Sequence, residues 1–239
     1  MHKLSAMKQL LFISVISILI SSCHHISGSG NIITQTRTTG DFKRIAASSG
    51  FEVEVKNGPT VDVVIEADDN VMEYVETSLK GDVLRIGLKD HVNLTGAHLK
   101  AYITAPQING IKASSGAEVT AKDQLKNAGK LSFSASSAGT IIADIDAPDV
   151  EASASSGSTI RLSGKTRDYD ATASSGSDVK SGELMSETTT VSASSGSSAT
   201  VHASVKLKAT ASSGASVHYY GGANVEKTVS SGGSVDKRD

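Results

Sequence analysis

The stretch Ala47-Ser48-Ser49-Gly50 decides the fold, because it returns throughout the C-terminal half of the chain. From the second copy on, the first serines follow one another at steps of 22, 19, 19, 20, 18 and 18 residues. A period near twenty over successive copies indicates a stacked-repeat protein, in which each repeat buries its inner face against its neighbours. The copies begin at Ala47, Ala113, Ala135, Ala154, Ala173, Ala193, Ala211 and Val229.

Apolar and polar residues alternate on both sides of each Ser-Ser-Gly. Counting the first serine as zero, apolar residues recur at offsets −3, −1 and +5, while polar residues recur at −2 and +4. This period of two predicts a strand, a bend and a second strand with one face buried, and the glycine supplies the bend. We therefore expect two interior ladders, one of Ala154, Ala173, Ala193 and Ala211 and one that includes Val179 and Val217.

The fold class that follows is all-β, a right-handed parallel β-helix (β-solenoid). Stacked rungs pair their strands in parallel and align equal positions. A left-handed helix with a hexapeptide repeat does not fit, because the inner residues at offsets −3 and +5 are eight positions apart. A flexible Ser/Gly linker would not keep Val or Ile at a fixed offset.

The N-terminus predicts export and anchoring. Residues 1–22 carry Lys3 and Lys8 before a short apolar run, which is typical of a signal peptide. Ile20-Ser21-Ser22-Cys23 resembles the lipobox of bacterial lipoproteins, which implies that Cys23 is lipidated and holds the protein in a membrane. The alternative is a plain secretory signal with an incidental cysteine. Residues 23–30 then form a tether.

Residues 31–106 are predicted to form an N-terminal β subdomain that includes the first rung and caps the solenoid of residues 107–239. The alternating segments 51–55 and 61–65, joined by a turn, favour a β-hairpin. Asn70 with Glu73 suggests a capping box, and hence one short helix over residues 71–79. A cap protects the edge of a stack from aggregation.

Composition argues against several classes of function and of site. The net charge is −2 and no basic run is present, which argues against nucleic-acid binding. The single cysteine leaves no disulfide framework and no thiolate metal cluster. No metal site is expected from His202 and His218 without a third ligand. Neither cofactor nor catalytic residue is predicted.

The outward positions offer a candidate binding stripe, Thr159, Asp178, Ser198 and Ser216, which share offset +4 on consecutive rungs. The partner would be a glycan or a protein surface. Two alternatives stay open: a carbohydrate-active β-helix enzyme and an accessory envelope protein. For the enzyme, Asp144 and Arg161 are expected on neighbouring rungs, with Tyr169 as the nearby aromatic.

The lipoprotein signal, the Gly28-to-Ile32 opening, Asp41-Phe42 before Ile45, and the Ser-Ser-Gly series together resemble the family described as "Putative auto-transporter adhesin, head GIN domain". The resemblance covers about Asn31 to Val235. It implies a β-helical, non-enzymatic envelope lipoprotein of the outer membrane with an adhesive role, and no catalytic residue carries over. Whether the protein faces the periplasm or the cell surface stays open.

Overall fold

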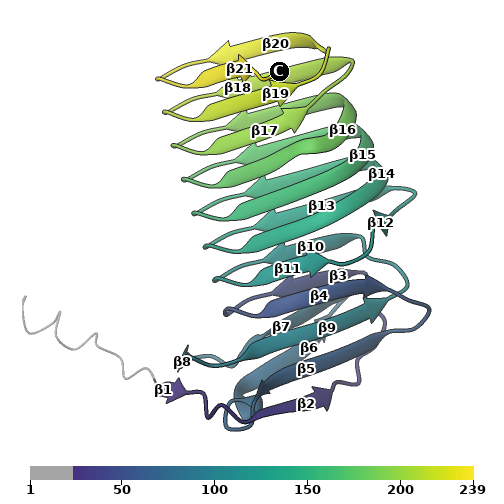
Figure 1. The fold of residues 1–239 in the computed structure, drawn as a ribbon, viewed down its shortest axis with the longest axis vertical. Coiled ribbons are helices and arrows are strands. Elements are labelled where there is room, and N and C mark those ends of the chain that lie inside the picture. Colours follow the sequence, from purple (N-terminus) through teal and green to yellow (C-terminus); the bar gives the residue numbers. More distant parts are fainter. Residues whose placement is uncertain (1–23) are drawn as a thin grey trace, which may run out of the picture.

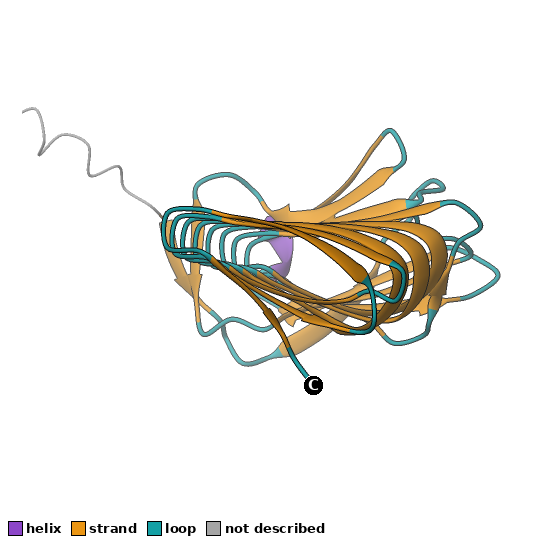
Figure 2. Ribbon diagram, turned by 90° about the horizontal axis from the view of Figure 1, so that it is seen from above, coloured by secondary structure: helices purple, strands orange, loops and turns teal. Residues whose placement is uncertain are grey.

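The computed structural model describes residues 24–239 and is a right-handed parallel β-helix of about 7 turns, with 63% of residues in strands (Figures 1 and 2). The predicted signal peptide and Cys23 lie outside the described residues. The predicted fold class is confirmed. Within the described residues, no helix has the length and hydropathy of a membrane span.

Each Ser-Ser-Gly forms a tight turn at one narrow edge of the stack, which Figure 2 shows as a row of aligned loops. In the copy at Ser174, both Ser175 (φ 53°) and Gly176 (φ 69°) have positive φ, and the Ser177 N–H donates to the Ser174 carbonyl at 3.2 Å. Positive φ at both central residues is the signature of a type I′ turn. The glycine was expected to supply the bend; the positive φ of the serine before it was not.

The turns are also bonded to one another along the stack. The Gly176 N–H donates to the Ser195 carbonyl of the next turn at 3.1 Å, and the Ser174 N–H donates to the Ala154 carbonyl of the previous rung at 3.0 Å. Each turn must therefore repeat the backbone conformation of its neighbour. This requirement explains why the same tripeptide recurs.

The strands of the rungs form two sheets. The front sheet contains the strands that follow each turn, and the back sheet contains those that precede it (Figure 1). Strands β14 (Thr140–Ala154), β15 (Thr159–Ala173) and β16 (Asp178–Ala193) bend round the wide edge and belong to both. The rest of the front sheet is β4 (Glu52–Asn57), β11 (Glu118–Ala121), β17 (Ser198–His202), β19 (Ser216–Tyr220) and β21 (Ser234–Lys237). The rest of the back sheet is β3 (Arg44–Ala47), β10 (Gly110–Ala113), β13 (Lys130–Ala135), β18 (Lys206–Ala211) and β20 (Asn224–Val229).

The interior consists of small side chains in ladders. Ala154, Ala173, Ala193 and Ala211 pair in register and are at most 1% exposed. Val179 and Val217 are equally buried, so both predicted ladders are confirmed. Interiors packed this closely respond to added volume, because neighbouring rungs cannot move apart without breaking their hydrogen bonds.

The wide edge changes shape where the repeat shortens from 20 to 18 residues. Strand β16 is 16 residues long, and its register with β15 shifts between Arg161 and Ser163. In the next rung the bend is cut to three residues between β17 and β18, so the upper rungs turn inside the wider ones (Figure 2).

The strands of residues 31–106 lie at the N-terminal end of the stack (Figure 1). Below β3 and β4 lie β7 (Val83–Leu88) and β9 (Leu99–Ala105), which pair with them in parallel. Outside these, β5 (Asp62–Asp68) pairs antiparallel with β9, and β6 (Val75–Lys80) pairs antiparallel with β7. Strand β2 (Ile32–Thr36) pairs antiparallel with β5 (Figure 1). A short strand β12 (Leu125–Lys126) pairs with β14.

Two local predictions in the cap are wrong. Strands β4 and β5 do not form a hairpin, because β9 inserts between them and pairs with both. The short helix over residues 71–79 is a single 3-10 turn, η1 (Met72–Tyr74), followed by β6. The Asn70 amide does not cap a helix but binds the N-terminal segment, donating to the Ser27 carbonyl at 2.9 Å.

Part of the segment 23–30 that the sequence assigns to a tether is ordered. His24–Ser27 form strand β1, which pairs in parallel with β8 (Val92–Thr95). This two-stranded sheet lies at the cap end of the stack (Figure 1).

Candidate binding face

The four residues of the predicted stripe lie side by side. Thr159, Asp178, Ser198 and Ser216 are register partners on β15, β16, β17 and β19, and all four are half-buried. We call them the front stripe. They are aligned because all share one offset from the turn, and parallel pairing without slip carries that offset from rung to rung.

The back sheet carries a comparable row. Ser153, Thr172, Ser192 and Thr210 pair in register on β14, β15, β16 and β18, and they point outward. We call this the back stripe. The solenoid thus presents two hydroxyl-bearing rows on opposite faces, and only the front stripe includes a charged residue.

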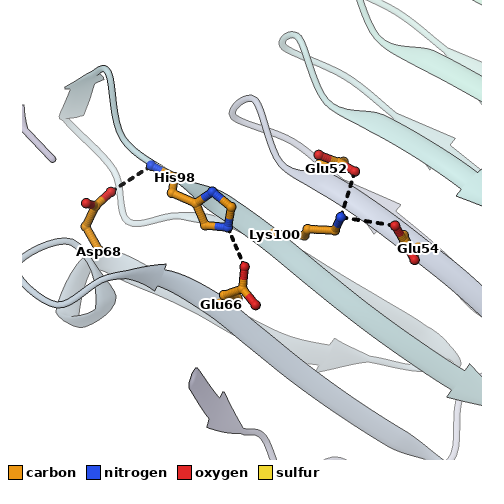
Figure 3. A network of polar contacts seen from close by, with 6 residues as sticks. All are labelled: Glu52, Glu54, Glu66, Asp68, His98 and Lys100. Carbon is orange, nitrogen blue, oxygen red and sulfur yellow. Dashed lines mark hydrogen bonds and ion pairs between the residues drawn. The ribbon is translucent and has the colours of Figure 1, made fainter. Parts of the chain in front are cut away.

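Towards the cap, the same front row becomes charged (Figure 3). Lys100 on β9 forms ion pairs with Glu52 and Glu54 on β4, each at 3.0 Å. The hydrogen bonds to Glu52 and then to Glu54 raise the pKa of Lys100, and the bond from Lys100 lowers the pKa of Glu54. The Lys100 pairs tie the cap to the first rung. Within the cap, His98, which directly precedes β9, contacts Glu66 on β5 at 2.6 Å.

The N-terminal segment is held at this end by Asp68. Its carboxylate is 2% exposed and accepts the N–H groups of His98 at 2.7 Å and Gly30 at 2.6 Å. Those backbone bonds, that from His98 first, lower the pKa of Asp68. Asp69 accepts hydrogen bonds from the Ser29 hydroxyl and the Asn31 amide. The Gly-Ser-Gly-Asn sequence therefore has a structural role, the closure of the cap.

A groove of about 880 Å³ crosses the front sheet beside the wide edge. It extends from Ala121 on β11 to Tyr220 on β19, which is six neighbouring strands or roughly 24 Å along the stack. Its polar lining includes Asp144, Arg161, Lys180, Glu183, Thr200 and His202. The sequence did not single out this groove, since its shape comes from the change in repeat length.

Of the three residues considered for an enzyme, two line the groove and one is buried in the interior. Asp144 and Arg161 both line the groove, but in the register Asp144 faces Ser163 and Arg161 faces Ile142. Tyr169 cannot serve as a sugar platform: it is 2% exposed, its hydroxyl lies 2.7 Å from the Ser181 hydroxyl in the interior, and burial raises its pKa.

His202 and His218 do not share a rung position, since Tyr220 faces His202 and Thr200 faces His218. The His218 Nε2 lies 3.2 Å from the Arg238 guanidinium. Within residues 24–239, no group of three or more His, Cys, Asp or Glu side chains is arranged to hold a metal ion.

Comparison with solved structures shows the same fold in several bacterial proteins. A putative adhesin from Bacteroides fragilis has a TM-score of 0.82 at 18% identity, over 89% of this chain and 100% of that one. A putative lipid binding protein from Parabacteroides distasonis has a TM-score of 0.75 at 18% identity, over 90% and 100% of the two chains. A putative adhesin from Parabacteroides merdae has a TM-score of 0.73 at 20% identity, over 90% of this chain and 99% of that one.

A comparison with functionally curated proteins found no match. A protein-family model, in contrast, matches residues 41–223, which span the cap, the first rung and most of the stack. The resemblance drawn from the Ser-Ser-Gly series is confirmed: the chain belongs to the family described as "Putative auto-transporter adhesin, head GIN domain".

Proposed function

We propose that this protein is a non-enzymatic, adhesin-like binding module of the bacterial cell envelope that binds a surface ligand through its front sheet. The observation that carries the proposal is the register of the front stripe, which puts four half-buried polar side chains in one row beside the groove. A regular polar row binds by adding many weak contacts. The family and the adhesins that share the fold support this role.

The proposal includes an anchor at Cys23, which makes the protein a lipoprotein of the outer membrane. Strand β1 begins at His24 and lies at the cap end, so a lipid on the preceding residue would hold the solenoid by its cap. Cys23→Ala should abolish labelling with a fatty-acid analogue and release the protein from membranes. Labelled, membrane-bound Cys23→Ala protein would contradict the anchor.

Binding is tested with an array of glycans and host-matrix proteins probed with the purified protein. We would then replace Thr159, Asp178, Ser198 and Ser216 by alanine singly and together. The affinity for the partner that the array identifies should fall gradually with each substitution. The matched control is the back stripe, with Ser153, Thr172, Ser192 and Thr210 replaced in the same way.

Two results would contradict the binding face. An equal loss from the back-stripe variants would mean that the hydroxyl rows are interchangeable, and complete loss from one substitution with silent neighbours would indicate a localised site. No binding to any member of the array would remove the support for an adhesin-like role.

One observation favours the carbohydrate-active enzyme as a second candidate. Asp144 and Glu183 both line the groove and face Ser163 from either side, which separates their backbones by roughly 10 Å. Inverting glycosidases carry two carboxyl groups about 6.5–9.5 Å apart. Release of reducing ends from soluble polysaccharides, lost in Asp144→Asn and in Glu183→Gln, would favour hydrolysis over binding.

A further inference from the structure

We propose that the groove binds a neutral glycan chain that lies along the stack, with Tyr220 as the platform for one sugar ring. This inference rests on the proposed binding function and adds to it a ligand class and a place.

The groove exists because wide and narrow rungs meet. The bulge opposite Leu162 adds a residue to β16, and the following rungs are two residues shorter. Glu183 on β16, Thr200 and His202 on β17 and Tyr220 on β19 line the open space at this step. A volume of about 880 Å³ is within the usual range of ligand sites, which is roughly 300–1,000 Å³.

Tyr220 leans across the groove floor. Its register partner on β17 is His202, yet its ring reaches past that strand to Gly182 on β16. A Cβ at Gly182 would lie 3.0 Å from Tyr220 Cε2 and 3.2 Å from Thr200 Cγ2. Gly182 thus leaves the space that the ring occupies. A half-buried tyrosine lying along the sheet offers an aromatic face to a ligand while its hydroxyl can remain in water.

The charges of the groove favour a neutral, hydroxyl-rich ligand. Asp144 and Glu183 balance Arg161 and Lys180, so neither a polyanion nor a polycation gains net attraction. Carboxylates accept hydrogen bonds and the two cations donate them, which suits hydroxyl groups because a hydroxyl does both. Protein partners anchor on several large aromatic side chains, and Tyr220 is the one Phe, Tyr or Trp of the lining, beside the smaller apolar Ile142, Ala143 and Leu162.

The dimensions favour a chain over a single sugar. The groove crosses six strands along the axis, and its polar residues are distributed over β14, β15, β16 and β17. An extended oligosaccharide could contact several of them at once, whereas a monosaccharide would leave most of them in water.

The test is affinity electrophoresis of the full chain in gels that contain a neutral polysaccharide (a β-glucan, a galactan, a mannan or a xylan) or an acidic one (an alginate). Retardation by at least one neutral polymer is expected. Tyr220→Ala should weaken it roughly tenfold or more, as expected for the loss of a central aromatic anchor. Tyr220→Phe should keep it, because the ring remains. Gly182→Val should weaken it by displacing the ring.

The matched control is Tyr102→Ala, which removes a half-buried tyrosine of the front sheet outside the groove. Thermal unfolding identifies any variant that is unfolded. If Tyr220→Ala is unfolded, the comparison of Gly182→Val with Tyr220→Phe tests the role of the ring instead. Retardation by the acidic polymer alone, or equal affinity of Tyr220→Ala and the unaltered protein, would overturn the inference.

The results distinguish a failure of the groove inference from a failure of the proposed function. If the front-stripe variants lose binding to the array partner while Tyr220→Ala keeps it, the proposed function stands and the groove inference falls. If nothing on the array is bound, both fall. If the polysaccharide is cleaved, the ligand class stands and the non-enzymatic role falls.

Discussion

The Lys227 ammonium lies 5.2 Å from the centre of the Tyr219 ring and donates a hydrogen bond to the Val235 carbonyl at 2.9 Å. Lys227 occupies offset −3, where the other rungs place Ile45, Phe133 or a smaller apolar side chain in the core. It stands on β20, which pairs with β18 alone among the described strands. A charged group thus covers the last interior position of the stack.

Lys227→Val should make the protein self-associate. The substitution leaves an apolar end beside the free edges of β20 and β21, and such edges pair with other chains unless a charge protects them. Sedimentation velocity should show a concentration-dependent larger species. Lys208→Val, an exposed outward position on β18, is the control and should stay monomeric. A Lys227→Val variant that behaves like the control would contradict the protective role.

Ala193→Leu should lower the free energy of unfolding by about 1–3 kcal/mol, because the added carbons overpack a ladder fixed by its neighbours Ala173 and Ala211. Ser192→Leu introduces the same side chain on the outward face and should change that free energy by less than about 0.5 kcal/mol. Urea unfolding measures both. Similar losses at the two positions would show that the alanine ladder does not limit the packing.

Ala138→Gly should stabilise the protein. Ala138 stands where the other turns have glycine, with φ of 61°, and a residue with a Cβ pays about 1–2 kcal/mol there. Part of the gain is offset by the greater freedom of glycine in the unfolded chain, so the net increase is about 1 kcal/mol in thermal or urea unfolding.

The reverse substitution is the control for this turn. Gly176 has φ of 69° and no atom within 4 Å of a would-be Cβ, so Gly176→Ala tests the backbone alone. It should lose about what Ala138→Gly gains. A Gly176→Ala variant of unchanged stability would mean that the turn tolerates Cβ at this φ.

Stability should depend on pH through Asp68. Its pKa in the folded state is lowered by the backbone bonds from His98 and Gly30, so the unfolded chain holds the proton more tightly. The contribution is fully present above the ordinary aspartate pKa of about 3.9 and is lost as the pH falls through the lower folded value. Thermal unfolding from pH 2 to 7 should show this loss of stability at low pH.

Asp68→Asn should lower the Tm at pH 7 and flatten this dependence. Asp62→Asn, at an exposed position of the same strand, is the control and should leave the profile unchanged. A pH profile that is the same in Asp68→Asn and the unaltered protein would show that Asp68 is not its source.

By itself, the sequence determined the repeat and which of its side chains face the interior and which face outward. A fixed offset from each Ser-Ser-Gly marks Ala193 as interior and Asp178 as outward, because a strand alternates its side chains and parallel pairing copies the pattern between rungs. The same regularity predicted the front stripe. Local signals also predicted a helix at Asn70, where the amide instead binds Ser27, 43 residues away in the chain.

Only the tertiary structure decided the features that depend on partners distant in sequence. The insertion of β9 between β4 and β5 replaced the expected hairpin, since strand pairing is settled by the whole sheet and not by a turn signal. The groove arises from a difference of two residues between successive repeats, which has no meaning until the rungs are stacked. Tyr220 then reaches Gly182 across an intervening strand, a contact that no local pattern encodes.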